Sequence, residues 1–179
     1  MELIMAGITL YLGGAKSGKT RLALAAAEAL PAPRLYLATA QAFDDEMTVR
    51  IKNHQAERGP DWRTIEAPLE PDKAISVLTG NSVVLLDCIT LWLNNLLAEN
   101  DDPDWIMTRV AELAASALAY AGPVIIVSNE VGGGIVPMNA LARKFRDLAG
   151  AANQLLAARA EKVVLAVAGL ELVVADRTR

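Results

Sequence analysis

The sequence of 179 residues contains only one cysteine, Cys88, and only one histidine, His54. A single cysteine excludes an internal disulfide and is typical of a reducing compartment, so we expect a cytoplasmic protein. Because Cys88 follows a continuous apolar run, we expect its thiol to be buried and inert. Aromatic residues make up only 4% of the chain, so the core must be built mainly from Ala, Val, Leu and Ile.

The sequence also lacks an excess of basic residues and a segment suited to a membrane. A net charge of −4 and a pI near 5.1 argue against a general nucleic-acid-binding surface. The longest uncharged stretch, residues 113–129, is shorter than the roughly 20 residues of a membrane helix and is interrupted by Gly122-Pro123. Glu2 near the start does not fit a signal peptide. A mean hydropathy of +0.29 suggests that some apolar surface is covered in an oligomer.

Short apolar runs alternate with helical patterns along the chain. The runs at residues 8–12, 34–38, 83–87 and 124–128 predict strands, and continuous apolar runs are typical of strands buried on both faces. Helical patterns cover residues 19–30, 45–58, 72–78, 89–98, 105–120 and 140–160. This alternation predicts a mostly parallel α/β sheet, and the two apolar runs around Gly169 predict a C-terminal β-hairpin. Without repeats or linkers, residues 1–179 are expected to form a single domain.

Residues 13–20 read "GGAKSGKT" and match the phosphate-loop pattern G-x-x-x-x-G-K-[ST] between a predicted strand and a predicted helix. Glycines allow backbone N–H groups to surround a phosphate, and the helix N-terminus adds positive potential. Lys19 would reach the β- and γ-phosphates, and the Thr20 hydroxyl would hold Mg²⁺. The predicted phosphate-binding residues are Gly13, Gly14, Ala15, Lys16, Ser17, Gly18, Lys19 and Thr20.

Asp87 ends the apolar run "VVLLD", which is the position of a Walker B carboxylate that binds Mg²⁺. In parallel α/β sheets, ligands bind beyond the carboxyl ends of the strands, where this residue and the phosphate loop are both expected. The two features predict a site for ATP or GTP with Mg²⁺. They do not identify the reaction, because phosphate loops serve kinases, ATPases and GTPases alike.

Arg50, His54 and Arg58 stand at four-residue spacing on the predicted helix over residues 45–58 and so form one stripe. The flanking positive charges would favour the neutral imidazole, which is the form that can act as a nucleophile. The two arginines could also bind a polyphosphate. The same spacing fits a solvated basic face with a structural histidine, and the residues alone leave both interpretations open.

Five segments together resemble one family, the bifunctional adenosylcobinamide kinase/adenosylcobinamide-phosphate guanylyltransferases of cobalamin biosynthesis. The similarity extends over nearly the whole chain, in the same order and with similar spacing. The segments are "LGGAKSGKT", "YLATAQAFDDEMTVRIKNHQAERGPDWRTIEAP", "VVLLDCITLWLNNLL", "VSNEVGGGIVPMNALARKFRDLAGAANQLLA" and "VVLAVAGLELVV". The second and fourth are far more specific than the phosphate loop.

The resemblance implies a RecA-like fold, a homotrimer, and guanylylation of the histidine that corresponds to His54. It implies two reactions: phosphorylation of adenosylcobinamide by ATP or GTP, and transfer of GMP from GTP to adenosylcobinamide phosphate. It also implies further nucleotide contacts from Ala38, Thr39, Ala40, Gln55, Ala56, Glu57, Arg58, Glu66 and Asp87.

The chain departs from the family pattern at a few positions. Lys16 and Thr20 stand where Arg and Ser are more common, and Asp87 stands where Glu is common, which shortens its reach. Gly133 occupies a variable position in "NEVGGGIVP". Two other functions fit the phosphate loop: a small-molecule kinase without nucleotidyl transfer, in which His54 is structural, and a RecA-like regulatory module that binds nucleotide without turnover.

Overall fold

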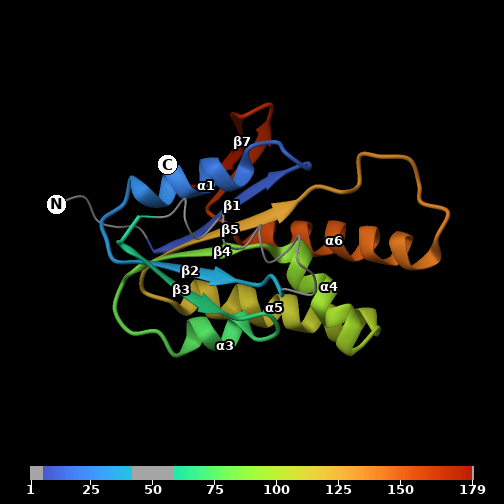
Figure 1. Ribbon diagram of the computed structural model, residues 1–179, viewed down its shortest axis with the longest axis horizontal. Coiled ribbons are helices and arrows are strands. Elements are labelled where there is room, and N and C mark those ends of the chain that lie inside the picture. The colour runs from blue at the N-terminus through green and yellow to red at the C-terminus, as the bar shows by residue number, and fades with distance from the viewer. Residues whose placement is uncertain (1–5, 42–58, 179) are drawn as a thin grey trace.

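The computed structural model describes residues 6–41 and 59–178, which form a seven-stranded sheet covered by helices on both faces (Figure 1). The strands are β1 (Gly7–Gly13), β2 (Arg34–Ala38), β3 (Trp62–Glu66), β4 (Val83–Asp87), β5 (Pro123–Asn129), β6 (Lys162–Val167) and β7 (Leu170–Asp176). The helices are α1 (Lys19–Glu28), α3 (Pro71–Ser76), α4 (Ile89–Glu99), α5 (Pro103–Ala119) and α6 (Ala140–Arg159).

The strand order is β3-β2-β4-β5-β1-β6-β7, and every pairing is parallel except that of β6 with β7. The predicted mostly parallel sheet and C-terminal hairpin are therefore confirmed. The parallel strands all end on the right-hand side of Figure 1, which is the edge where ligands are expected.

The central strands are buried on both faces because successive side chains point to opposite sides of the sheet. On β4, Val84 and Leu86 pack into the larger core beneath α3, α4, α5 and α6, whereas Val83 and Leu85 pack into the smaller core beneath α1 (Figure 1). β5 divides its side chains in the same way. Continuous aliphatic runs are therefore what these positions require.

The four strands and five of the six helices expected from the sequence are present in the described residues, with boundaries shifted by a few residues. The sixth, the helix expected over residues 45–58, lies outside the described residues. Strand β3 was not predicted. Its sequence "WRTIE" has three polar residues of five and is only half-buried, because the strand lies at the edge of the sheet against β2.

Among the described residues, no helix is both long enough and apolar enough to cross a membrane.

Candidate nucleotide-binding site

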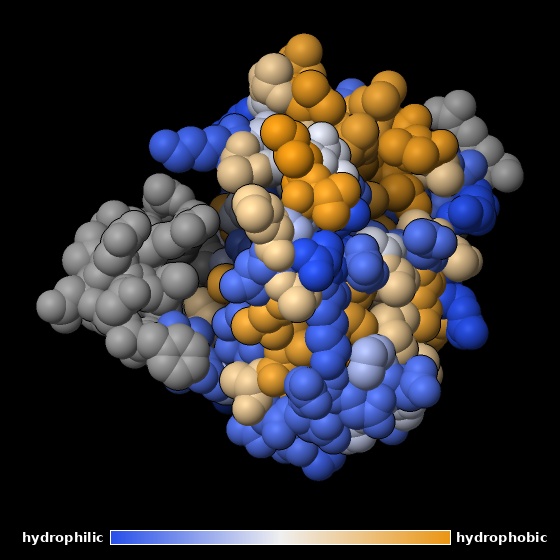
Figure 2. Space-filling view, turned by 90° about the vertical axis from the view of Figure 1, so that its right-hand side faces the viewer, coloured by the Kyte–Doolittle hydropathy of each residue, from blue (hydrophilic) through white to orange (hydrophobic). Residues whose placement is uncertain are grey.

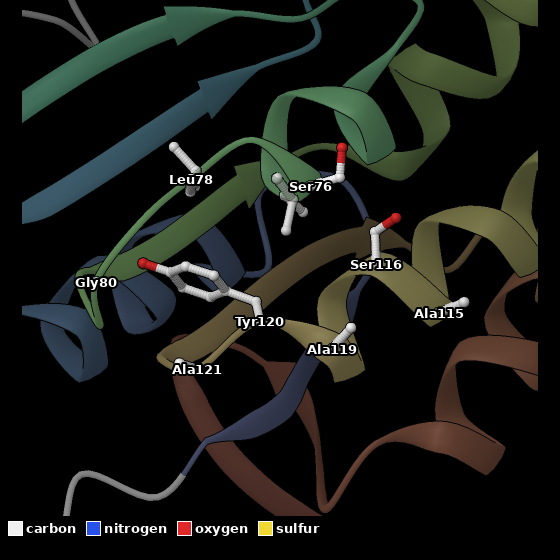
Figure 3. Close-up of a pocket in the computed structure, with 9 residues that line it drawn as sticks. Ser76, Leu78, Gly80, Ala115, Ser116, Ala119, Tyr120 and Ala121 are labelled. Carbon is white, nitrogen blue, oxygen red and sulfur yellow. The ribbon is translucent and has the colours of Figure 1, made fainter.

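Two hollows in the described part of the chain each have a volume of about 500 Å³, so size does not distinguish them. The first lies between the ends of α3 and α5, close to the start of β4 (Figure 3). Its hydroxyl groups come from Ser76, Ser116 and Tyr120, and the Tyr120 hydroxyl already donates to the Ser82 carbonyl at 3.0 Å. This hollow is at the opposite end of the strands from the phosphate loop.

The second hollow lies at the carboxyl ends of β1, β5 and β6. It is bordered by the phosphate loop, by the segment that follows β5, and by the end of the C-terminal hairpin. Glu130 is its carboxylate, and Glu130 Oε1 accepts a hydrogen bond from the Gly132 N–H at 2.6 Å. A hollow lined by a phosphate loop and a carboxylate is the better candidate for chemistry on a phosphorylated ligand.

The phosphate loop connects β1 directly to α1, as the motif predicts. Gly18 has φ +90°, and a Cβ on Gly13 would lie 2.8 Å from the Ala166 carbonyl oxygen, so both positions require glycine. The Ser17 N–H and Lys19 Nζ both donate to the Gly14 carbonyl, at 3.2 Å and 3.1 Å. The lysine therefore lies over the loop at the start of α1, where it can meet a bound phosphate.

Three predicted nucleotide contacts lie side by side across neighbouring strands. Ala38 is in register with Glu66 on β3 and with Asp87 on β4. Asp87 Oδ2 accepts a hydrogen bond from the Tyr36 hydroxyl at 2.9 Å. Because β5 lies between β1 and β4, two strand spacings, about 10 Å, separate this row from the strand that carries the phosphate loop. The structure thus brings these described residues to one edge of the sheet, in two neighbouring groups.

Thr39 is fully buried and joins the ends of β2 and β4. Its hydroxyl donates to the Cys88 carbonyl and accepts from the Cys88 N–H, both at 2.8 Å. Its own N–H donates to the Asp87 carbonyl at 3.2 Å, and its carbonyl accepts from Asn95 Nδ2 at 2.8 Å. Thr39 therefore shapes the site by fixing the position of Asp87, and a direct contact between Thr39 and nucleotide stays a prediction.

Cys88 is buried, as expected, and burial raises the pKa of its thiol to about 11, with the Asp87 carboxylate adding to the shift. The thiol is therefore protonated at neutral pH. Since the thiolate is the nucleophilic form, Cys88 is not a candidate nucleophile.

Two polar groups at this edge, Thr90 and Asn95, were not singled out from the sequence. Both lie on α4, which starts immediately after Asp87 and Cys88, and both are buried. Asn129, at the end of β5, donates through Nδ2 to the Thr90 hydroxyl. The sequence signal for Thr90 was its place in "DCIT", directly after an apolar strand. Its contact with Asn129 could not be predicted, because that contact depends on the pairing of β4 with β5.

Several predicted residues fall where the structure gives no description. His54 and the adjoining positions Gln55, Ala56, Glu57 and Arg58 lie outside the described residues, and so does Arg50. Their assignments therefore stay predictions.

Thr20 and Asp87 are the predicted ligands of Mg²⁺, and each carries an oxygen of the kind that this ion prefers. No group of three His, Cys, Asp or Glu side chains in residues 6–41 and 59–178 could hold a metal ion alone. A nucleotide-bound Mg²⁺ does not need one, because it uses one or two protein oxygens together with phosphate oxygens and water. A hydroxyl at the start of α1 and a carboxylate at the end of β4 fit that requirement.

Comparison with known proteins gave a consistent result. The sequence model of the family described as "Cobinamide kinase / cobinamide phosphate guanyltransferase" matches residues 9–174. The Bifunctional adenosylcobalamin biosynthesis protein CobU of Salmonella typhimurium is 44% identical over 177 residues, covering 90% of this chain and 96% of that protein. The corresponding protein CobP of Pseudomonas aeruginosa is 45% identical over 166 residues, covering 91% of this chain and 94% of that protein.

Solved structures with a similar fold include the RadB recombinase, with a TM-score of 0.54 and 17% identity over 89% of this chain and 74% of that one. A type III secretion system ATPase has a TM-score of 0.63 and 10% identity over 97% of this chain and 57% of that one. At these identities the similarity concerns the fold alone. The expectation of a RecA-like α/β fold is confirmed.

We predict that Thr39→Val lowers the free energy of unfolding by about 2 kcal/mol, because valine keeps the shape but leaves the buried N–H and carbonyl of Cys88 without their partner. Urea denaturation measures this loss. Thr108→Val is the matched control, because the Thr108 hydroxyl donates to the Asp104 carbonyl on the exposed surface of α5. Equal, small effects of both substitutions would contradict the structural role of Thr39.

Proposed function

The chain belongs to the cobinamide kinase / cobinamide phosphate guanyltransferase family, and from this premise we propose how its residues divide the two reactions. As a member of this family it is a transferase that acts as a kinase on cobinamide and as a guanylyltransferase on cobinamide phosphate. The observation that carries the proposal is the meeting of the phosphate loop and the Ala38–Glu66–Asp87 row at one edge of the sheet.

In the kinase reaction, the hydroxyl of the aminopropanol arm of adenosylcobinamide attacks the γ-phosphate of ATP or GTP. A bond forms between that oxygen and the γ-phosphorus, the hydroxyl proton passes to water, the bond to the β,γ-bridging oxygen breaks, and the nucleoside diphosphate leaves. Lys19 and the backbone N–H groups of the loop stabilise the charge that spreads over the phosphate oxygens. Positioning the two substrates supplies much of the remaining acceleration.

Thr20 and Asp87 would hold Mg²⁺, which neutralises charge on the phosphate oxygens when it is bound. Asp87 is well placed for this role because the Tyr36 hydroxyl and the backbone bond from Thr39 fix the end of β4. The shorter side chain of aspartate, compared with the glutamate common in relatives, brings the carboxylate closer to its own strand.

In the guanylyltransferase reaction, neutral His54 attacks the α-phosphate of GTP, pyrophosphate leaves, and a GMP–histidine phosphoramidate forms. The phosphate of adenosylcobinamide phosphate then attacks that phosphorus and releases the histidine, giving adenosylcobinamide-GDP. A covalent intermediate divides a reaction between two anions into two easier steps. The resemblance of the segment around His54 to the family supports this assignment, with Ala38, Glu66, Asp87 and Gln55–Arg58 as nucleotide contacts.

We further propose a single catalytic domain over residues 1–179 that works as a cytoplasmic homotrimer. Support for an oligomer comes from large apolar side chains that are exposed on β7 and on the segment before α6. Leu170 and Leu172 are 72% and 58% exposed, and Ile135 and Met138 are 96% and 99% exposed. Figure 2 looks onto the edge where the parallel strands end and shows hydrophobic side chains gathered over its upper part, where β7 lies. Such a surface is typical of an interface between subunits.

Because Lys19 and His54 are assigned to different reactions, we predict that substituting each one impairs a different activity. Lys19→Ala should lower the kinase turnover at least 100-fold, because the transition state loses a positive charge next to the transferred phosphate. His54→Ala should abolish transfer of GMP while leaving kinase turnover within about threefold of the wild type. An assay of ADP release measures the kinase turnover, and an assay of adenosylcobinamide-GDP formation measures GMP transfer.

Lys73→Ala serves as the control, because Lys73 is an exposed lysine on α3, which packs on the opposite face of the sheet from α1 and the phosphate loop. It should leave both activities unchanged. Kinase turnover by Lys19→Ala at the wild-type rate, or GMP transfer by His54→Ala, would contradict the corresponding assignment.

Light scattering after size exclusion should give the mass of three chains for the wild type. Leu172→Glu should give a smaller species, because a charge at this exposed position on β7 would be buried in the interface. Val77→Glu, at a residue 75% exposed on the other side of the molecule, should remain trimeric. A monomeric wild type would exclude the trimer.

A further inference from the structure

The turn between β6 and β7 holds the phosphate loop from outside. The Gly169 N–H donates to the Ser17 carbonyl at 2.8 Å, and Arg21 Nη2 donates to the Gly169 carbonyl at 3.0 Å. The approach is close, since a Cβ on Gly18 would lie 3.0 Å from Gly169 Cα. Both polar groups of one turn residue are thus bonded to the loop and to the helix that follows it.

The bond to Ser17 determines where the next N–H group points. The carbonyl of Ser17 and the N–H of Gly18 belong to one planar trans peptide, so they point in opposite directions. Because the carbonyl faces the hairpin, the Gly18 N–H faces away from it, on the inner side of the loop. An inward N–H at the start of a helix is the donor that an anionic phosphate needs.

The hairpin is itself fixed to the strand that precedes the loop. β6 pairs with β1 up to Gly13, which is in register with Ala166, and the Tyr11 hydroxyl on β1 donates to Glu171 Oε1 on β7 at 3.1 Å. Burial and the nearby Glu171 carboxylate raise the pKa of Tyr11, so its hydroxyl remains a donor at neutral pH. The turn therefore has little freedom to move relative to β1.

We propose that Gly169 and Arg21 are positioning residues, which preorganise the Gly18 N–H of the phosphate loop for the polyphosphate of the nucleotide. This inference rests on the proposed role of the loop in binding ATP or GTP. Loss of the contact leaves the loop with more conformations, so binding of a polyphosphate must order it. The weaker binding should concern the phosphate chain of the ligand and should not depend on its base.

Binding of GTP, ATP and inorganic tripolyphosphate to Arg21→Ala, Arg21→Lys and Gly169→Ala tests this role, together with the kinase KM and kcat. Arg21 is exposed, so its truncation leaves the core intact. Alanine at residue 169 would have to adopt φ +79°, which moves the turn without changing any charge.

Each variant has a matched control at the other end of the sheet. Arg177 also donates to backbone carbonyls, those of Ala157 and Ala160 at the end of α6, so Arg177→Ala removes a comparable contact far from the loop. Gly80 has φ +86° with open space around it, so Gly80→Ala introduces comparable backbone strain. Thermal melting of all variants separates loss of stability from loss of binding.

We expect Arg21→Ala and Gly169→Ala to raise the Kd of all three ligands about three- to tenfold, the effect of losing one hydrogen bond. The kinase KM should rise by the same factor with kcat within twofold, Arg21→Lys should recover part of the binding, and both controls should bind as the wild type does.

Unchanged tripolyphosphate binding by Arg21→Ala and Gly169→Ala would overturn the inference. An effect of Arg21→Ala alone would also overturn it, since it would assign the effect to the charge of Arg21. A wild type that binds none of the three ligands would overturn the proposed function, and this inference with it.

Discussion

The hydrogen bonding of β5 to β1 on one side and to β4 on the other sets the position of the phosphate loop relative to Asp87. The register aligns Gly13 with Asn129 and Asp87 with Val127, so the phosphate loop, Asn129 and Asp87 reach the same edge of the sheet. β5 can occupy this place because its side chains are buried on both faces, in the two separate cores. A shift of one residue would exchange the two sets of side chains and displace the loop from the carboxylate.

The central strands could be predicted from the sequence because burial on both faces leaves a continuous aliphatic run that turn residues interrupt. β3 could not be predicted in this way. Trp62 packs edge-on against Tyr36 of β2, and the strand exists because β2 offers it a hydrogen-bonding edge. The five residues of β3 do not show a strand pattern by themselves, since an edge strand need not be apolar throughout.

The candidate site was predictable where a local motif describes it and less so where distant residues meet. The phosphate loop follows from eight consecutive letters. The role of Thr39 depends on its bonds with Cys88, 49 residues further along the chain, and the contact between Arg21 and Gly169 spans 148 residues. Such contacts depend on strand order, which periodicity does not encode. The assignment of His54 came from the family resemblance, because its helical spacing with two arginines also fits an ordinary basic surface.

In the proposed mechanism, one chain uses a histidine to carry GMP between GTP and a corrinoid phosphate. Intact-mass spectrometry after incubation with GTP and Mg²⁺ tests it most directly. We expect the protein to gain the mass of one GMP and to lose this gain when adenosylcobinamide phosphate is added. A mass that does not change in the presence of GTP, while adenosylcobinamide-GDP is still formed, would contradict the covalent mechanism.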